Sequence, residues 1–357
     1  MRLYLIGAGA IAHTHAEAAA KLREPVELRV ADPSDAARTA FLAAHPSARA
    51  FRTAEEMLAS EPAAPGDIAV VATPPAFHSG PARAAARSGR NVLCEKPLAM
   101  SVAEAEEMLR VATEHGMLLG SCSTRFRGLP HTEAVKRVLA SGALGDVYSL
   151  TFVTKWPRSR AGIEYQPASR WFLDSSQSGG GVVMDWGPYD MSTLFDILRP
   201  TAVEVTDAWI AQPKTGADPT DIVFDTESHA GATLRFGTAD GIVHVAFERA
   251  SATHGEEFAR AELSGTLGSL RWTPFDSQQP VHLRTDRDGE PHEEVVEPPE
   301  RDDLTIFDRP LLHFVAAVAG EPSLASLGRD AVTEFRCLRA IYEVAATGRP
   351  ARVEVGG

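Results

Sequence analysis

The feature that most constrains the fold of this 357-residue chain is a regular alternation of short apolar runs and helical patterns over its first third. The apolar runs have the length of strands and occupy residues 3–6, 26–31, 67–72, 92–94 and 117–121. The third run is continuously apolar after its first residue, which is typical of a strand whose two faces are both covered. Strands that alternate with helices in this way predict an α/β domain with a parallel, doubly wound sheet.

The pattern changes beyond residue 123. Residues 203–296 alternate between apolar and polar positions, which is typical of strands in a mostly antiparallel sheet, and residues 276–301 are expected to be loop and edge strand. Helical patterns cover residues 130–141, 181–198, 304–319 and 329–346. The sequence therefore predicts a first domain over residues 1–122, followed by an α+β domain over residues 123–357.

Two helix starts in the first domain carry a capping box, at Thr53–Glu56 and Ser101–Glu104. In this motif a hydroxyl and a carboxylate three residues apart each accept a hydrogen bond from a backbone N–H that the helix leaves without a partner. We therefore expect helices to begin directly after Thr53 and Ser101.

The composition excludes several classes of partner. A formal net charge of −13 argues against nucleic acid and anionic membranes, which both attract basic surfaces. The three cysteines are far apart and lack zinc-binding spacing, so we expect free thiols in a reducing compartment and no metal. Gly7 and Gly9 interrupt the apolar amino terminus early, which favours a first strand over a signal peptide. No apolar stretch approaches the ~18 residues of a membrane span, so we expect a soluble, cytoplasmic protein.

A glycine-rich turn joins the first expected strand to the first helix. Gly7-x-Gly9-x-x-Ala12 has the spacing of a dinucleotide-binding motif. Gly7 permits a tight turn, Gly9 lets the backbone approach a pyrophosphate, and Ala12 allows close packing of helix on strand. The positive end of the helix dipole would then hold the phosphates.

Asp32 stands at the end of the second expected strand, about twenty residues after the glycine turn. A carboxylate at this place can accept hydrogen bonds from the ribose hydroxyls of a dinucleotide and repels the 2′-phosphate of NADP. The sequence therefore favours NAD as the cofactor. Ser34 and Arg38 lie close enough to leave NADP open as an alternative.

Two further loops follow interior strands. Thr73-Pro74-Pro75-Ala76-Phe77-His78 can be a proline-capped turn, and Glu95-Lys96-Pro97 can be a solvated strand end. A lysine is nevertheless costly in a strand interior, because burial of an unpaired ammonium costs on the order of several kcal/mol or more. At the carboxyl end of a strand it would lie at the edge of the sheet where open α/β folds bind their ligands.

The second domain contains the unusual stretch Gly179-Gly180-Gly181 followed by Asp185, Gly187-Pro188 and Tyr189. Asp185 and Tyr189 are four residues apart and share one face of a helix. Gly187-Pro188 inside this helical pattern would lower helix stability, because glycine loses more entropy on folding and proline lacks an N–H. Such a cost often marks a functional site, whereas the alternative is a helix start with an exposed aspartate.

Together these motifs resemble the glucose-fructose oxidoreductase, inositol dehydrogenase and rhizopine catabolism protein family (Gfo/Idh/MocA), essentially from end to end. The matching segments, in chain order, are Gly7–His15, Thr73–His78, Glu95-Lys96-Pro97, Thr124-Arg125-Phe126, Gly142–Gly145 and Ala345–Pro350. The resemblance implies a Rossmann domain followed by an α+β domain with a large, mostly antiparallel sheet, often used for dimerisation. It also suggests a cis Lys96–Pro97 bond.

One position departs from the family pattern. The second family signature usually reads Asp-x-Gly-x-His, with the histidine as proton shuttle, whereas here Asp185 and Gly187 match and Tyr189 replaces the histidine. A tyrosine there is similar to the glucose-fructose oxidoreductase and dihydrodiol dehydrogenase branches. Ser192 stands where the family often has Asp or His, so an imidazole mechanism does not carry over to this chain.

The resemblance implies hydride transfer between nicotinamide and a secondary alcohol or ketone of a sugar, sugar derivative or cyclic polyol. We predict that Lys96 donates to the reacting oxygen, that Tyr189 takes or returns the hydroxyl proton, and that Asp185 orients Lys96 or the substrate hydroxyl. A nearby ammonium would favour the phenolate of tyrosine. Predicted substrate contacts are Arg125, Arg170 and Trp171. Predicted cofactor contacts are Gly7, Gly9, Ala10, Ile11, Asp32, Thr73, Pro74, His78, Glu95 and Lys96.

Two alternatives stay open at the level of sequence. The chain could be a non-catalytic dinucleotide-binding regulator of the same fold, although the complete set of Lys96, Asp185 and Tyr189 argues against this. It could also be an NAD-dependent glycosidase that oxidises a ring carbon transiently. We expect a small-molecule sugar or polyol substrate and a homodimer or homotetramer formed through the second-domain sheet.

Overall fold

The computed structural model describes residues 1–300 and 302–355. By internal contacts the chain divides into two compact units, Met1–Arg125 with Leu304–Val332, and Phe126–Asp303 with Thr333–Gly357. The division differs from the expected domains in the segment Leu304–Val332, which joins the first unit although it lies late in the sequence. The reason is a short strand, β15 (Ser326–Leu327), which pairs with the last parallel strand of the first unit.

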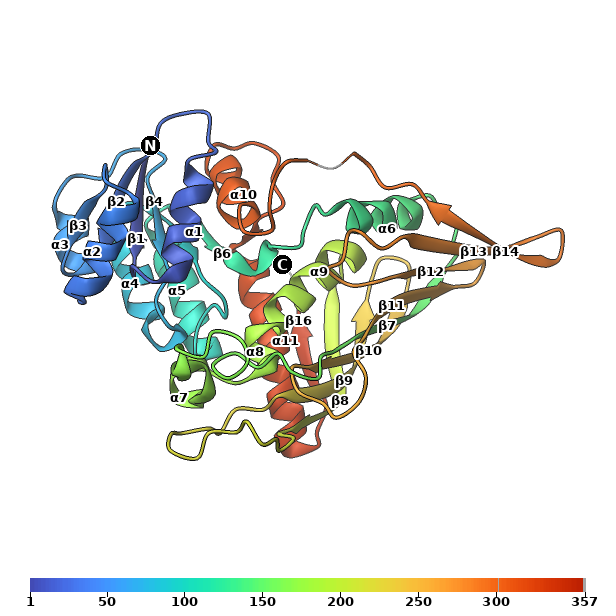
Figure 1. The fold of residues 1–357 in the computed structure, drawn as a ribbon. Helices are drawn as coiled ribbons and strands as arrows, with labels where there is room; N and C mark the ends of the chain where they lie inside the picture. Colours follow the sequence, from blue (N-terminus) through green and yellow to red (C-terminus); the bar gives the residue numbers. More distant parts are fainter. Residues whose placement is uncertain (301, 356–357) are drawn as a thin grey trace. The chain divides into compact units, whose positions relative to one another are not determined.

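The first unit is built on a seven-stranded sheet in the order β15-β6-β5-β4-β1-β2-β3 (Figure 1). The strands β1 to β6 are mutually parallel, and only β15 runs antiparallel. Their bounds are β1 Arg2–Ile6, β2 Glu27–Ala31, β3 Arg49–Phe51, β4 Ile68–Val71, β5 Asn91–Cys94 and β6 Leu119–Ser121. This is the predicted doubly wound α/β sheet, and its central strands β1 and β4 are almost completely buried.

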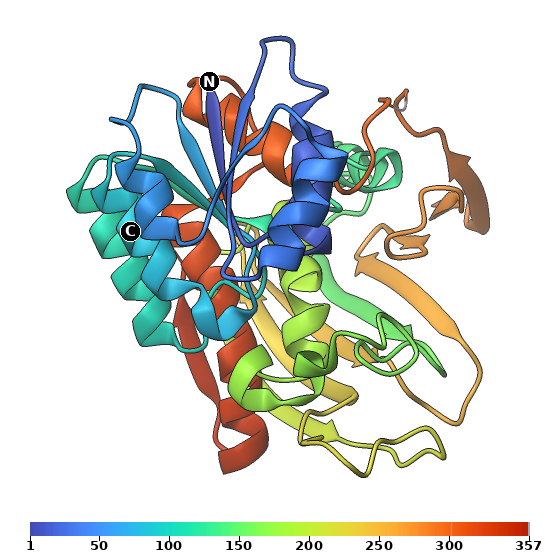
Figure 2. The same cartoon turned by 60° about the vertical axis from the view of Figure 1, so that its left-hand side comes forward.

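Helices follow the parallel strands and cover the sheet, as the two views show (Figures 1 and 2). They are α1 Ala10–Ala19, α2 Asp35–Ala44, α3 Ala54–Ala59, α4 Ser79–Arg87, α5 Val102–Glu114 and, from late in the chain, α10 Arg309–Val318. One core joins β1, β2 and β4 to α1, α2 and α10, with Phe41 and Phe314 as its largest buried side chains. Both helix starts are capped as expected on the hydroxyl side, because Thr53 and Ser101 each accept from the N–H three residues on at 3.2 Å. The carboxylates of Glu56 and Glu104 accept instead from the N–H one residue before each cap, that of Arg52 and of Met100.

The second unit contains a nine-stranded sheet in the order β14-β13-β12-β11-β7-β10-β9-β8-β16. All neighbours are antiparallel except β7 and β10, which confirms the predicted mostly antiparallel sheet. The strands are β7 Val147–Lys155, β8 Ala202–Ala211, β9 His229–Gly237, β10 Ile242–Ala250, β11 Phe258–Gly265, β12 Gly268–Trp272, β13 Val281–Arg287, β14 Glu290–Val296 and β16 Ala351–Glu354. Their apolar positions lie on one buried face, for example Leu150, Val245 and Leu263.

The second unit also contains helix α6 (Pro130–Ala140) and most of helix α11 (Gly328–Thr347), whose first residues belong to the first unit. The segment 181–198, predicted as one helix, forms two, α8 (Val182–Asp185) and α9 (Gly187–Leu198), with Trp186 between them. Over 276–300 the structure has more strand than expected, a hairpin of β13 and β14 with β14 at the sheet edge. Residue 301, the last of the expected loop, lies outside the described residues. Among the described residues, no helix is long and apolar enough to span a membrane.

Candidate active site

The glycine turn of the first unit has the geometry that a dinucleotide requires. Gly7 has φ +105°, and a Cβ there would lie 2.7 Å from the carbonyl oxygen of Ala72, so both the backbone angle and the space demand glycine. Gly9 is the N-cap of α1, and neither a capping side chain nor an acidic residue occupies the first turn of this helix. The exposed start of α1, at Gly9 and Ala10 with Ile11 beside them, can therefore receive a phosphate through backbone N–H groups.

Asp32 lies beside this turn, as predicted. One carboxylate oxygen accepts a hydrogen bond from Ala8 N at 2.9 Å, and the other accepts from Ser34 N at 2.8 Å. Arg38 donates to the main-chain carbonyl of Asp32 at 2.5 Å and forms an ion pair with Asp35. The carboxylate at the end of β2 is thus fixed in place, while the nearby guanidinium is already paired with an acid.

His78 ties two loops of the first unit together. Its ring is fully buried, with Nδ1 3.0 Å from the carbonyl oxygen of Pro97 and Nε2 2.8 Å from that of Thr73. Burial lowers the pKa of His78, although these carbonyls and Glu95 oppose the effect. The segment from Thr73 and Pro74 to His78, which includes a short 3₁₀ turn (Pro75–Phe77), is held against the loop that follows β5.

Glu95 anchors the loop that carries Lys96. The carboxylate is 5% exposed, and it accepts from the backbone N–H of Lys96 at 3.2 Å. His15 Nε2 lies 3.0 Å and Arg125 Nη2 lies 3.4 Å from its other oxygen. Burial alone would raise the pKa of Glu95, but Arg125, His15 and Lys96 together hold it well below its usual range. The Lys96–Pro97 peptide bond is cis, as the resemblance suggested.

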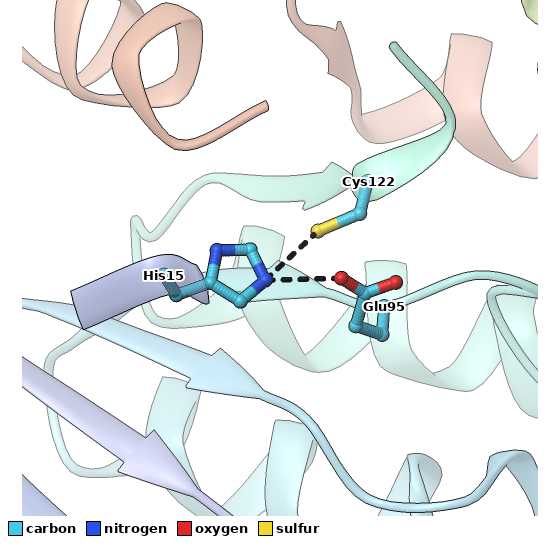
Figure 3. A group of neighbouring side chains, drawn as sticks. All are labelled: His15, Glu95 and Cys122. Atoms are coloured by element: carbon cyan, nitrogen blue, oxygen red, sulfur yellow. Dashed lines mark hydrogen bonds and ion pairs between the residues drawn. The ribbon is translucent and has the colours of Figure 1, made fainter. Parts of the chain in front are cut away.

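Figure 3 shows the buried group formed by His15, Glu95 and Cys122, of which the sequence had singled out only Glu95. His15 Nε2 also lies 3.9 Å from the Cys122 sulfur. Nitrogen, oxygen and sulfur donors within 4.8 Å of one another could in principle hold Zn²⁺. However, Arg125 already supplies a positive charge to the carboxylate, and burial raises the pKa of the Cys122 thiol well above its usual value. The arrangement therefore fits a hydrogen-bonded anchor better than a metal site.

Asp185 and Tyr189 lie on consecutive helices of the second unit. Asp185 is half-buried at the end of α8, and Tyr189 is 3% exposed in the first turn of α9. The ring of Tyr189 packs edge-on against Phe126 and Trp186, with centroids 5.3 and 5.6 Å apart. Pro188 stands in the first turn of a new helix, where proline is well tolerated. The expectation that Gly187-Pro188 weakens the interior of one helix was therefore wrong.

An ion pair directly after Tyr189 was missed from the sequence. Asp190 and Arg249 are both fully buried and form two hydrogen bonds, one of them 2.9 Å from Nε to Oδ2. The guanidinium carbon also lies 5.1 Å from the Trp186 ring centroid and 5.2 Å from that of Trp156. A charged pair with stacked aromatic rings fixes the start of α9 to the sheet strand β10. No local sequence signal links two residues that are 59 positions apart.

The three predicted substrate contacts lie in different places. Arg125 belongs to the first unit, where it pairs with Glu95 and stacks over Phe307 at 4.7 Å. Arg170 is exposed in the second unit and donates to the carbonyl of Gly162 at 2.9 Å. Trp171 stacks on the next residue in the chain, with ring centroids 3.8 Å apart.

The first unit thus brings the predicted cofactor residues to the carboxyl edge of its sheet, after β1, β2, β4 and β5. A parallel sheet of this kind binds ligands at that edge. The second unit presents a carboxylate and a phenol on adjoining helices. An ammonium, a carboxylate and a phenol are groups that can move a proton to or from a hydroxyl, while a nicotinamide cofactor would supply the redox chemistry.

Two family models match the chain. The first, described as an oxidoreductase family with an NAD-binding Rossmann fold, covers residues 1–121, and the second, a GFO/IDH/MocA C-terminal domain, covers residues 132–271. A 1,5-anhydro-D-fructose reductase from Ensifer adhaerens is 28% identical over 81% of this chain and 80% of its own length. An inositol 2-dehydrogenase from Rhizobium meliloti (strain 1021) is 26% identical over 92% of each chain.

Among solved structures, the WlbA dehydrogenase from Bordetella pertussis, in complex with NADH and UDP-GlcNAcA, has the same fold. It superposes with a TM-score of 0.78 at 23% sequence identity and covers 100% of this chain and 99% of its own. At this identity the similarity concerns the fold, and it agrees with the two domain types described above.

Proposed function

The chain belongs to the GFO/IDH/MocA oxidoreductase family, whose first domain is an NAD-binding Rossmann fold, and from this premise we propose its function. The protein is an NAD-dependent dehydrogenase or reductase that transfers a hydride between nicotinamide and a secondary alcohol or ketone of a sugar or cyclic polyol. The relatives named for anhydrofructose reduction and inositol oxidation support this substrate class. The observation that carries the proposal is the buried anchor of Glu95, which holds Lys96 at the ligand-binding edge of the sheet.

The residues divide the work as follows. The start of α1 and Asp32 bind the pyrophosphate and ribose of the cofactor, and the loops at Thr73 and Lys96 lie beside its nicotinamide. Lys96 donates to the reacting oxygen and stabilises its alkoxide character as the hydride leaves. Tyr189 takes the hydroxyl proton in oxidation and returns it in reduction. Asp185 orients the proton-transfer groups, and Arg170 and Trp171 contact the cofactor or substrate.

NAD is the proposed cofactor rather than NADP. The Asp32 carboxylate is held by two backbone N–H groups, so it cannot turn away from a 2′-phosphate without losing both hydrogen bonds. Arg38, the nearest candidate for a phosphate contact, is paired with Asp35. A lower KM for NADP than for NAD would contradict this assignment.

We further propose a homodimer or homotetramer that forms through the sheet of the second unit, and a cytoplasmic location. One face of this sheet exposes large apolar side chains, among them Trp209, Ile242 and Phe258, each more than 40% exposed. Large exposed apolar groups gathered on one sheet favour association. The three cysteines are free and buried, which suits a reducing compartment. Light scattering coupled to gel filtration would contradict the assembly if it gave the 38.3 kDa mass of one chain.

The direct test of the function is a spectrophotometric screen. Purified protein is incubated with NAD or NADP and a panel of sugars and polyols that includes myo-inositol, and with NADH and 1,5-anhydro-D-fructose for the reverse direction. We expect stoichiometric formation or consumption of NADH with at least one compound. Tight NADH binding without turnover would favour a regulator, and release of free sugar from glycosides with no net NADH would favour a glycosidase.

A further inference from the structure

The run Gly179-Gly180-Gly181 is explained by a close approach to two residues that lie far away in the sequence. A Cβ on Gly181 would overlap with the backbone of Glu227, and a Cβ on Gly180 would overlap with the phenol oxygen of Tyr342. Gly180 also has φ +154°, which other residues rarely adopt. The glycines therefore let the chain pass between Glu227, two residues before β9, and Tyr342 of helix α11.

Glu227 then satisfies the backbone N–H groups that open helix α8. Its carboxylate accepts from Gly181 N at 2.8 Å and from Val183 N at 3.0 Å, and its own carbonyl accepts from Val182 N at 3.0 Å. The hydroxyl of Tyr342 donates to the same carboxylate at 2.7 Å. Glu227 is only 8% exposed, and its burial raises the pKa of the carboxyl while these donors oppose the rise.

The helix that Glu227 holds consists of one turn and ends at Asp185. The backbone N–H of Asp185 donates to the carbonyl of Gly181 at 2.9 Å, so the fixed start of the turn determines where its end lies. Asp185 and Glu227 also line the same small cavity, of about 20 Å³. This is room for a single water molecule and not for a sugar, so Glu227 itself does not bind the substrate ring.

We infer that Glu227, held by Tyr342, is a positioning residue that sets the Asp185 carboxylate for proton transfer. The inference rests on the proposed function, because it assigns Glu227 to the same reaction. This positioning role differs from a purely stabilising role. In a purely stabilising role, loss of the Glu227 carboxylate would lower the melting temperature but leave turnover per folded molecule unchanged.

The test compares Glu227→Gln with Asp185→Asn and with the double variant, using the panel compound that the wild type turns over fastest. We expect Asp185→Asn to lower kcat about 100-fold, because the carboxylate that orients the proton-transfer groups is lost. Glu227→Gln should lower kcat about 10-fold, with KM for NAD and the Kd of NADH unchanged, since the cofactor residues lie in the other unit. The double variant should be no slower than Asp185→Asn alone, because both changes remove the same contribution.

Two further variants sharpen the test. Tyr342→Phe removes one of the donors to Glu227, and kcat should fall about threefold, less than for Glu227→Gln. Glu343→Gln changes the exposed neighbour on the same helix, so both kcat and melting temperature should stay at wild-type values. Multiplicative losses in the double variant, or a wild-type kcat in folded Glu227→Gln protein, would overturn the inference.

Failure of the proposed function gives a different result, because then the wild type itself turns over no panel compound. In that case, whether Glu227 holds the turn of helix α8 can be measured by hydrogen exchange of the backbone amides of residues 181–186. We expect exchange about 10-fold faster in Glu227→Gln than in the wild type and unchanged in Glu343→Gln. Equal exchange in all three proteins would show that Glu227 does not hold this turn.

Discussion

The two units of the molecule prepare their parts of the proposed site in different ways. The first unit uses loops at strand ends, where side chains such as His78 and Glu95 fasten one loop to the next. The second unit uses the start of two consecutive helices, which Glu227 and Arg249 fasten to more distant parts of the fold. The difference teaches that recognisable local motifs mark the proposed cofactor side of the site, even though contacts such as that of His15 with Glu95 fasten its loops over a long sequence distance. No local motif marks the contacts that support Asp185 and Tyr189, the residues proposed for proton transfer in the second unit.

The strongest expected effect separates chemistry from cofactor binding. Lys96→Ala should lower kcat about 10³-fold and weaken NADH binding far less, because the ammonium acts chiefly on the reacting oxygen although Lys96 is also a predicted cofactor contact. Tyr189→Phe should behave in the same way from the other unit. Steady-state kinetics and NADH fluorescence titration measure the two quantities. Near-normal turnover of Lys96→Ala would require the proton-transfer scheme to be abandoned.

The next effect compares a glycine from each unit. Gly181→Ala should lower the free energy of unfolding by about 3 kcal/mol or more, because the added Cβ overlaps with backbone that cannot swing aside. Gly7→Ala should cost about 1–3 kcal/mol and also weaken NADH binding at least tenfold. Urea unfolding and NADH titration of both variants test this, with Gly216→Ala, an open site in the second unit, as the control. Loss of NADH binding in folded Gly181→Ala protein would contradict the proposal that the first unit alone binds the cofactor.

His131 in the second unit and Glu61 in the first should contribute to the pH dependence of stability over different pH ranges. Burial lowers the pKa of His131 in the second unit to about 4, so its neutral form stabilises the fold above pH ~6.5 and this stability is lost as the pH falls toward 4. In the first unit, Arg29 and Arg2 lower the pKa of Glu61 to about 2. The ionised carboxylate of Glu61 therefore stabilises the fold above pH ~4.5, and this stability is lost only as the pH falls below that value.

Unfolding measurements between pH 2 and 8 on two variants check this prediction. His131→Asn should remove a dependence worth about 2–3 kcal/mol between pH 6.5 and 4. Glu61→Gln should flatten the curve only below pH 4.5. Identical pH profiles for the wild type and His131→Asn would contradict the assignment of a buried neutral imidazole.

The smallest effect concerns a helix cap in the first unit. Thr53→Ala removes the hydroxyl that accepts from Glu56 N, which should cost about 1 kcal/mol. Thr53→Ser keeps the hydroxyl and should stay within about 0.5 kcal/mol of the wild type. Because the cap lies away from the cofactor residues, kcat and the Kd of NADH should not change in either variant. A Thr53→Ala protein as stable as the wild type would mean that water replaces the hydroxyl without loss of stability.

The sequence was informative where the relevant contacts are local. Helices α3 and α5 begin directly after Thr53 and Ser101, as expected, and the glycine turn with Asp32 also forms as expected. Each of these features depends on residues close in the chain or on a recognised spacing. The α8–α9 break was not predicted, since the apolar pattern continues through Trp186, where one helix ends and the next begins. The strand β7 was also not predicted as a strand, although it lies at the centre of the second sheet.

The supporting residues of the site escaped prediction for a related reason. His15 meets Glu95 across 80 residues, and Tyr342 meets Glu227 across 115. Each is an ordinary polar residue on a helix until the fold brings its partner close. The three glycines at 179–181 were the one available signal, because a run that excludes every side chain indicates a close approach by some other part of the chain.

The central claim is direct hydride transfer between substrate and nicotinamide, with Lys96 as a required group. It can be tested with a sugar or polyol from the panel that carries deuterium on the carbon bearing the reactive hydroxyl. We predict that mass spectrometry of the NADH formed by the wild type finds one deuterium per molecule, and that Lys96→Ala forms the same product about 10³-fold more slowly. NADH without deuterium, or an undiminished rate in Lys96→Ala, would contradict the account.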